Sequence, residues 1–205
     1  VLVAIGRKPN TDNLGLENTK IKVDERGLIP IDQEQRTAEK NIFAIGDVTR
    51  GPALAHKASR EGKVAAEVIA KHPSAFDNRA IPAVVFTDPE IAWTGLTEQE
   101  AKEQNIEYKV GRFPLSALGR ARSMGKIQGF VKILSDPKSN LVLGVAIVGS
   151  MASELIAEGT LAIEMGATLE DLIVSIHPHP TMSESLMEAA EVAAGEPVHV
   201  LPMKR

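Results

Sequence analysis

Residues 175–191 read Ser175-Ile176-His177-Pro178-His179-Pro180-Thr181-Met182-Ser183-Glu184-Ser185-Leu186-Met187-Glu188-Ala189-Ala190-Glu191, a histidine-bearing lead-in to a strongly helical segment. Proline fixes its own φ and restricts the residue before it to extended backbone, so the lead-in is stiff and non-helical. In an extended run, side chains two positions apart point the same way but lie well separated along the chain. His177 and His179 can therefore have different neighbours, and only one of them need face a reactive site.

Glu184 follows His179 by five residues and falls in the first turns of the predicted helix. A carboxylate that folds back onto one ring nitrogen fixes the tautomer and raises the basicity of the other nitrogen, as a general base requires. The same stretch also fits a capping box, with Thr181 as the N-cap and Glu184 three positions into the helix. The residues alone leave both interpretations of Glu184 open.

A resemblance to a known family adds to this pattern. His177-Pro178-His179-Pro180-Thr181 followed by Ser183-Glu184 resembles the C-terminal active-site signature of the dihydrolipoamide dehydrogenases, flavin-dependent members of the pyridine-nucleotide disulfide oxidoreductases. The resemblance implies that His179 is the general base, reaching across a homodimer, and that Glu184 orients it. It also implies FAD and NAD as cofactors, and lipoyl-bearing subunits of 2-oxoacid dehydrogenase complexes as partners.

Composition excludes several classes of protein and of site. The 205 residues carry a net charge of -4 and 3% aromatic residues, so neither a basic footprint nor a stacking platform for nucleic acid is expected. No apolar run reaches the length of a membrane span, and we expect a cytoplasmic protein without a membrane partner. The chain has no cysteine, which excludes a disulfide scaffold and a thiol redox centre within it. No metal site is predicted, because the two histidines of the 175–191 stretch lack a further acidic or histidine cluster nearby.

The first part of the chain is expected to contain strands and one helix. Val1-Leu2-Val3-Ala4-Ile5-Gly6 is a continuous apolar run, typical of a buried parallel strand, and it begins abruptly, as if cut in mid-domain. Residues 21–23 and 28–32 alternate around a turn and predict a hairpin. Gly6 and the four residues after it resemble the family's return from the NAD domain to the FAD domain. By that resemblance Gly6 lies near NAD, although a glycine that closes a strand is an equal interpretation.

Two further motifs resemble parts of a flavin site. Residues 41–47 predict a strand that ends in Gly-Asp, and residues 37–47 resemble the family's second FAD-binding motif, in which Asp47 holds the flavin ribitol. A helix is predicted from Gly51 to about Lys71, and its start offers unpaired N–H groups. The segment Ala53, Leu54, Ala55 and His56 matches the one that the family places against the flavin's pyrimidine edge. His56 is assigned proximity to the cofactor and no catalytic role.

The remainder of the chain predicts an α+β domain. Residues 72–79 form a linker, and strand patterns follow at 83–86, 91–94, 108–113, 130–134 and 141–148, with a capping box at 97–100 and an apolar helix at 152–166. An antiparallel sheet with helices on one face is expected, and it resembles the family's dimerisation domain. We therefore expect the end of an NAD-binding domain at 1–12, the C-terminal part of an FAD-binding α/β domain at 13–78 and the dimerisation domain at 79–205.

What the chain lacks limits what it is expected to do alone. It has no Gly-x-Gly-x-x-Gly turn after a strand, no full NAD domain and no cysteine pair, so the isolated chain is expected to be inactive and to retain neither cofactor. The implied parent activity is the oxidation of protein-bound dihydrolipoamide with reduction of NAD. The alternatives are a glutathione-reductase-like enzyme and a non-catalytic homodimerisation module. A mercury reductase is disfavoured because residues 198–205 contain no cysteine pair.

The apolar content of two predicted helices favours a homodimer. Seven of their residues exceed what one core face needs, and excess apolar surface marks an obligate interface. These residues are Leu155, Ile156, Ile163, Leu186, Met187, Val192 and Ala193. Residues 1–78 are expected to be frayed or rearranged, because the first strand lacks its sheet partners.

Overall fold

The computed structural model describes residues 1–201. Two units make up the chain: the first is Val1–Asp77, and the second begins at Asn78. The expected division into domains at 12/13 and 78/79 stays a prediction.

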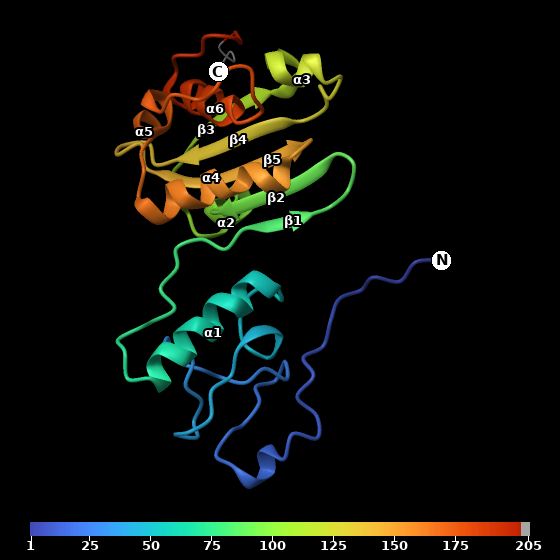
Figure 1. Cartoon of the computed structure of the whole chain (residues 1–205), viewed down its shortest axis with the longest axis vertical. Helices are drawn as coiled ribbons and strands as arrows, with labels where there is room; N and C mark the ends of the chain where they lie inside the picture. The colour runs from blue at the N-terminus through green and yellow to red at the C-terminus, as the bar shows by residue number, and fades with distance from the viewer. Residues whose placement is uncertain (202–205) are drawn as a thin grey trace. The chain divides into compact units, whose positions relative to one another are not determined.

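The second unit is built on a five-stranded antiparallel sheet in the order β1-β2-β5-β4-β3 (Figure 1). The strands are β1 (Ala83–Val85), β2 (Glu90–Gly95), β3 (Lys109–Pro114), β4 (Phe130–Ser135) and β5 (Val142–Gly149). The helices are α2 (Glu98–Glu103), α3 (Gly119–Ser123), α4 (Ala152–Met165), α5 (Leu169–Val174) and α6 (Glu184–Ala194), with a 3₁₀ turn, η3, at Leu115–Ala117. The predicted antiparallel α+β architecture is confirmed.

The two longest helices of this unit cover one face of the sheet. Val145 of β5 pairs with Ile133 of β4, which pairs with Gly111 of β3, and residues directly opposite one another in a sheet share a face. Gly159 of α4 lies against Val145, and the backbone of α6 lies against Gly111. Both helices therefore pack on the same side, where their apolar stripes and the sheet form the main core.

Local signals predicted the connections well. The capping box at residues 97–100 is complete, with Thr97 accepting from the N–H of Glu100 and Glu100 accepting from that of Thr97. In the tight turn before β5, the Asp136 carboxylate accepts the N–H groups of Lys138 and Ser139. Such contacts join residues that are close in sequence, so the sequence pattern alone predicts them.

The prediction that seven apolar residues of α4 and α6 exceed what the core needs is wrong for five of them. Leu155, Ile156, Ile163, Leu186 and Ala193 are buried within the chain's own core, and Met187 and Val192 are half-buried. Residues of both helices and of the sheet belong to one core. The exposed apolar side chains of this region are others: Leu161, Met165, Val174 and Ile176.

The first unit contains α1 (Ala55–Ile69) and two 3₁₀ turns, η1 (Leu16–Asn18) and η2 (Gly46–Val48) (Figure 1). The strand predicted at residues 1–6 is wrong, because this run is exposed and no strand within the described residues 1–201 pairs with it. A parallel strand needs partners that are distant in sequence, and an apolar run does not show that they are present.

The hairpin predicted at residues 21–32 and the strand at 41–47 are also wrong. The Asp24 carboxylate accepts the N–H groups of Arg26 and Leu28, which makes a turn without a ladder beyond it. The only pairing found in residues 1–77 is an isolated bridge between Arg36 and Phe43. The helix prediction is confirmed, although α1 begins later than Gly51, at Ala55, because the residues before it are extended.

None of the helices within residues 1–201 combines the length and the apolar character that crossing a bilayer requires.

Replacing Gly111 with alanine should destabilise the second unit. A Cβ at this position would lie 2.1 Å from the carbonyl oxygen of Ala189 and 2.5 Å from the nitrogen of Ala193, so α6 would have to move off the sheet. We expect the free energy of unfolding to fall by about 1–3 kcal/mol, as overpacked cores do. Urea unfolding followed by circular dichroism measures it. Gly119→Ala is the control, because its Cβ would meet nothing closer than 3.9 Å. Equal midpoints for the two variants would contradict this packing.

Candidate active site

His177 is the anchored member of the histidine pair. Its side chain is 8% exposed, and its Nε2 lies 2.7 Å from Oε1 of Glu158 on α4. Its Nδ1 lies 2.9 Å from the carbonyl oxygen of Ser175. Both ring nitrogens thus lie within hydrogen-bonding distance of an oxygen that can accept. The pair connects the segment before α6 to α4. The sequence does not predict it, because Glu158 lies 19 residues before His177 on a separate element.

His179 is the exposed member. Its Nδ1 lies 2.8 Å from Oε1 of Glu184, while its side chain is 77% exposed and that of Glu184 only 14%. A carboxylate accepts, so Nδ1 donates the hydrogen bond and the neutral ring keeps the lone pair on Nε2. Within residues 1–201 no hydrogen bond engages Nε2. The ring is therefore held at one nitrogen and open at the other.

The Glu184 carboxylate serves two partners with its two oxygens. Oε2 accepts the backbone N–H of Thr181 at 2.7 Å, while Oε1 accepts from His179. The Thr181 hydroxyl contacts the carbonyl oxygen of Pro178 and the hydroxyl of Ser183, so it does not complete the capping box. The helix starts after Ser183 without a side-chain cap. The interpretation of Glu184 as the partner of His179 thus applies to Oε1, and half of the predicted capping box, the contact with the Thr181 N–H, applies to Oε2.

These contacts set the charge of Glu184. Burial alone would raise the pKa of its carboxyl group, but the N–H of Thr181 and the ring of His179 together outweigh burial. The pKa therefore lies below its ordinary value, and Glu184 is ionised at neutral pH. An ionised carboxylate at Nδ1 favours a positive charge on the ring after Nε2 takes a proton.

The first unit holds a second group of candidate residues around a cavity of about 510 Å³. Asp47 lies at the start of η2, exposed to solvent, with its Oδ2 3.6 Å from a guanidinium nitrogen of Arg7. The same nitrogen of Arg7 donates to the carbonyl oxygen of Ala53 at 3.1 Å. The cavity is lined by Arg7, Lys8, Pro9, Asn10, Arg26, Leu28, Asp47, Val48, Thr49, Gly51 and Ala53. A carboxylate that accepts from hydroxyl groups, set in a basic and partly apolar hollow, fits a polyhydroxylated ligand such as the flavin side chain.

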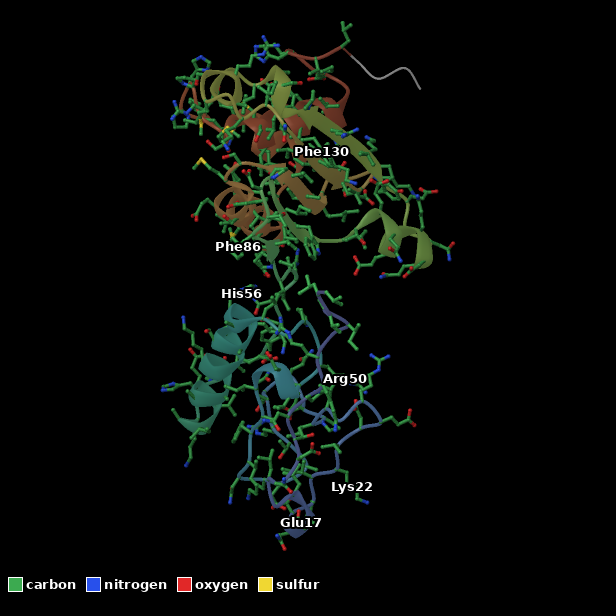
Figure 2. All side chains as sticks on the ribbon, turned by 90° about the vertical axis from the view of Figure 1, so that its right-hand side faces the viewer. Glu17, Lys22, Arg50, His56, Phe86 and Phe130 are labelled. Atoms are coloured by element: carbon green, nitrogen blue, oxygen red, sulfur yellow. The ribbon has the colours of Figure 1, made fainter. Side chains whose placement is uncertain are left out.

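The other candidate residues of the first unit are not among those that line this cavity. Gly6 is exposed in an open stretch with a φ of +120°. Leu54 is the N-cap of α1 and forms no side-chain cap, so that the helix start is not closed by a side chain. Ala55 and His56 are exposed on the first turn, where Figure 2 shows His56 at the end of α1. The structure thus brings Asp47 and Ala53 together through Arg7, a residue that sequence reasoning did not assign to the site.

No group of three or more acidic, histidine or cysteine side chains suited to a metal ion occurs in the part of the chain that the structure describes.

Comparison with known proteins supplies the context for these geometries. Residues 1–62 match the family model described as pyridine nucleotide-disulphide oxidoreductase, and residues 81–190 match its dimerisation domain. A dihydrolipoyl dehydrogenase of Geobacillus stearothermophilus is 55% identical over 98% of this chain and 43% of its own length. One of Halobacterium salinarum is 56% identical over 98% of the chain and 42% of its length. The chain thus spans about two fifths of the length of these curated relatives.

Solved structures agree with the sequence matches. The crystal structure of LpdA from Mycobacterium tuberculosis has a TM-score of 0.83 at 31% identity, over 89% of this chain and 40% of that one. The HOCl-induced flavoprotein disulfide reductase RclA from Escherichia coli has a TM-score of 0.81 at 32% identity, over 89% of this chain and 42% of that one.

Removing the His179 ring should raise the pKa of the Glu184 carboxyl group. Burial remains while one of the groups that lower the pKa is lost, so His179→Ala shifts the balance toward the neutral acid. Carboxyl ¹³C NMR over a pH titration of the chain measures this. His199→Ala is the control, since His199 contacts Glu188 on the same helix and not Glu184. An unchanged Glu184 pKa in His179→Ala would show that the hydrogen bond has no energetic effect.

Proposed function

The chain belongs to the pyridine nucleotide-disulphide oxidoreductase family, and we propose that it supplies the C-terminal portion of a dihydrolipoyl dehydrogenase. The proposed reaction is the oxidation of a protein-bound dihydrolipoyl group with reduction of NAD. Relatives at 50–56% identity over 98% of the chain carry that name, which supports this enzyme over a glutathione-reductase-like one.

The observation that carries the proposal is the orientation of His179. Its Nδ1 is held by the ionised Glu184 at 2.8 Å, and its open Nε2 has a lone pair for a proton. A dithiol must lose a proton to react, because the thiolate is the attacking form in thiol–disulfide exchange. We assign His179 as the base that takes this proton at Nε2, and Glu184 as the group that stabilises the imidazolium formed. The His177–Glu158 pair fixes the loop that presents the ring.

The residues around Asp47 are proposed as part of a flavin site. FAD, when bound, supplies the two-electron carrier between a dithiol and NAD. Asp47 would accept hydrogen bonds from the ribityl hydroxyls, and the start of α1, with Ala53 to His56, would face the flavin ring. Gly6 is proposed to lie near NAD. That this chain alone retains neither cofactor, and that it is inactive without further sequence, stay predictions.

A homodimer is proposed, supported by the match of residues 81–190 to the dimerisation model. The exposed apolar side chains of Leu161, Met165, Val174 and Ile176 are the surface that we assign to it. Lipoyl-bearing subunits of 2-oxoacid dehydrogenase complexes are the proposed partners. The expected cytoplasmic location stays a prediction.

Substituting either member of the pair should slow the full-length protein. We expect Glu184→Gln to lower kcat by about 10- to 100-fold, the range for residues that orient a functional histidine. His179→Gln should lower it by about 100- to 10,000-fold, since general-base catalysis is lost. Steady-state rates with dihydrolipoamide and NAD measure both.

His199→Gln is the matched control, since it removes an exposed histidine that also pairs with a glutamate of α6. Its rate should equal that of the unsubstituted protein. Near-normal turnover in both Glu184→Gln and His179→Gln would contradict the catalytic assignment and favour a C-terminal portion that serves dimerisation without contributing a catalytic residue.

A further inference from the structure

A buried ion pair on α1 has no place in the mechanism above. The ammonium group of Lys57 lies 2.9 Å from Oε1 of Glu61, one helical turn away, and the two side chains are only 2% and 3% exposed. Removing two charges from water has a large free-energy cost, which a single ion pair does not offset. Such a pair needs further hydrogen-bonding partners, and the position of those partners indicates what it holds.

The additional partners all belong to the turn that carries Asp47. Lys57 donates to the carbonyl oxygen of Gly46 at 3.1 Å and to the hydroxyl of Thr49 at 3.0 Å. Glu61 accepts the N–H of Gly46 at 2.6 Å through its second oxygen. The Thr49 hydroxyl lies 2.8 Å from the carbonyl oxygen of Gly46 and 3.3 Å from the Glu61 carboxylate. The N–H and the C=O of Gly46 are therefore both held by α1.

This network fixes the backbone of the turn and leaves the Asp47 side chain outside it. Gly46 has a φ of +79°, and a Cβ there would lie 3.3 Å from the Cβ of Ala58, so the turn packs directly on the helix. Asp47 follows it with an exposed carboxylate that lies 3.6 Å from a guanidinium nitrogen of Arg7. The buried charges thus hold the peptide next to Asp47, and the carboxylate is presented to the cavity on a fixed backbone.

We infer that Lys57 and Glu61 are positioning residues for flavin binding, acting by fixing the η2 turn so that the Asp47 carboxylate meets the ribityl hydroxyls. The inference rests on the proposed role of Asp47. An apolar pair could fill the same space and is often equally stable. What it could not do is bind both polar groups of Gly46, so the pair is better explained by the geometry of the turn than by the stability of the unit.

The test replaces both charges at once, because removing one would leave the other buried and could unfold the unit. Lys57→Met with Glu61→Leu keeps the volume and helix propensity. Lys63→Met with Glu67→Leu is the matched control, since it removes an exposed lysine and glutamate at the same spacing on α1. FAD dissociation constants of the apo full-length protein, from fluorescence titration, are compared among the original protein, both doubles, Asp47→Asn and the triple variant.

We expect the Lys57/Glu61 double variant to fold and to bind FAD about tenfold more weakly, by analogy with other supporting residues, while the Lys63/Glu67 double is unchanged. Because the effect passes through Asp47, the triple variant should bind no more weakly than Asp47→Asn, apart from about twofold. Unchanged affinity in the Lys57/Glu61 double variant, or a triple variant in which the two losses multiply, would overturn the inference.

A second measurement separates this inference from the proposed function. Hydrogen exchange of the Gly46 amide, followed by NMR in the 205-residue chain, should be faster in the Lys57/Glu61 double variant. Faster exchange together with normal FAD affinity in Asp47→Asn would leave the network as the support of the turn and refute the flavin role of Asp47. Unchanged exchange would refute the positioning role itself.

Discussion

The candidate catalytic site depends on one constraint, the pair of hydrogen bonds that the two oxygens of the Glu184 carboxylate accept. One oxygen holds the backbone of the lead-in at Thr181, and the other holds the ring of His179. Both contacts require the start of α6 to stay in place, and α6 stays in place because Leu186 is fully buried and Gly111 lets the helix backbone approach the sheet. The orientation of one exposed ring therefore depends on how closely a helix packs on a sheet.

In both units, buried side chains fix the backbone and exposed side chains are the candidates for contact with a ligand. The two histidines of the lead-in each contact a glutamate, yet His177 is enclosed and bonded at both nitrogens, whereas His179 is open at one. In the first unit a buried pair, Lys57 with Glu61, holds a turn, and the carboxylate of Asp47 beside it is exposed. In each case the enclosed side chains fix the backbone, and an exposed group of similar chemistry remains available to a ligand.

The sequence predicts this structure well where the signals are local. The signals for the five strands and for the capping box at Thr97 lie in neighbouring residues, and so does the five-residue spacing that allows Glu184 to reach His179. It fails where the partner is remote. The apolar run at residues 1–6 does not show whether a sheet is there to receive it. The apolar side chains of α4 and α6 do not show whether their own sheet or another molecule covers them. Neither the helix partner of His177 nor the turn held by Lys57 has any signature in spacing, because contacts of that kind exist only after the chain has folded.

The tautomer of His179 tests the central claim most directly. At about pH 9, well above the ordinary range in which histidine titrates, the rings are neutral and each carries a single proton. Ring ¹⁵N NMR of the chain should place the proton of His179 on Nδ1, facing Glu184, and leave Nε2 unprotonated. A proton on Nε2 would mean that the Glu184 carboxylate does not orient the ring, and the account of His179 as a base aimed by Glu184 would be wrong.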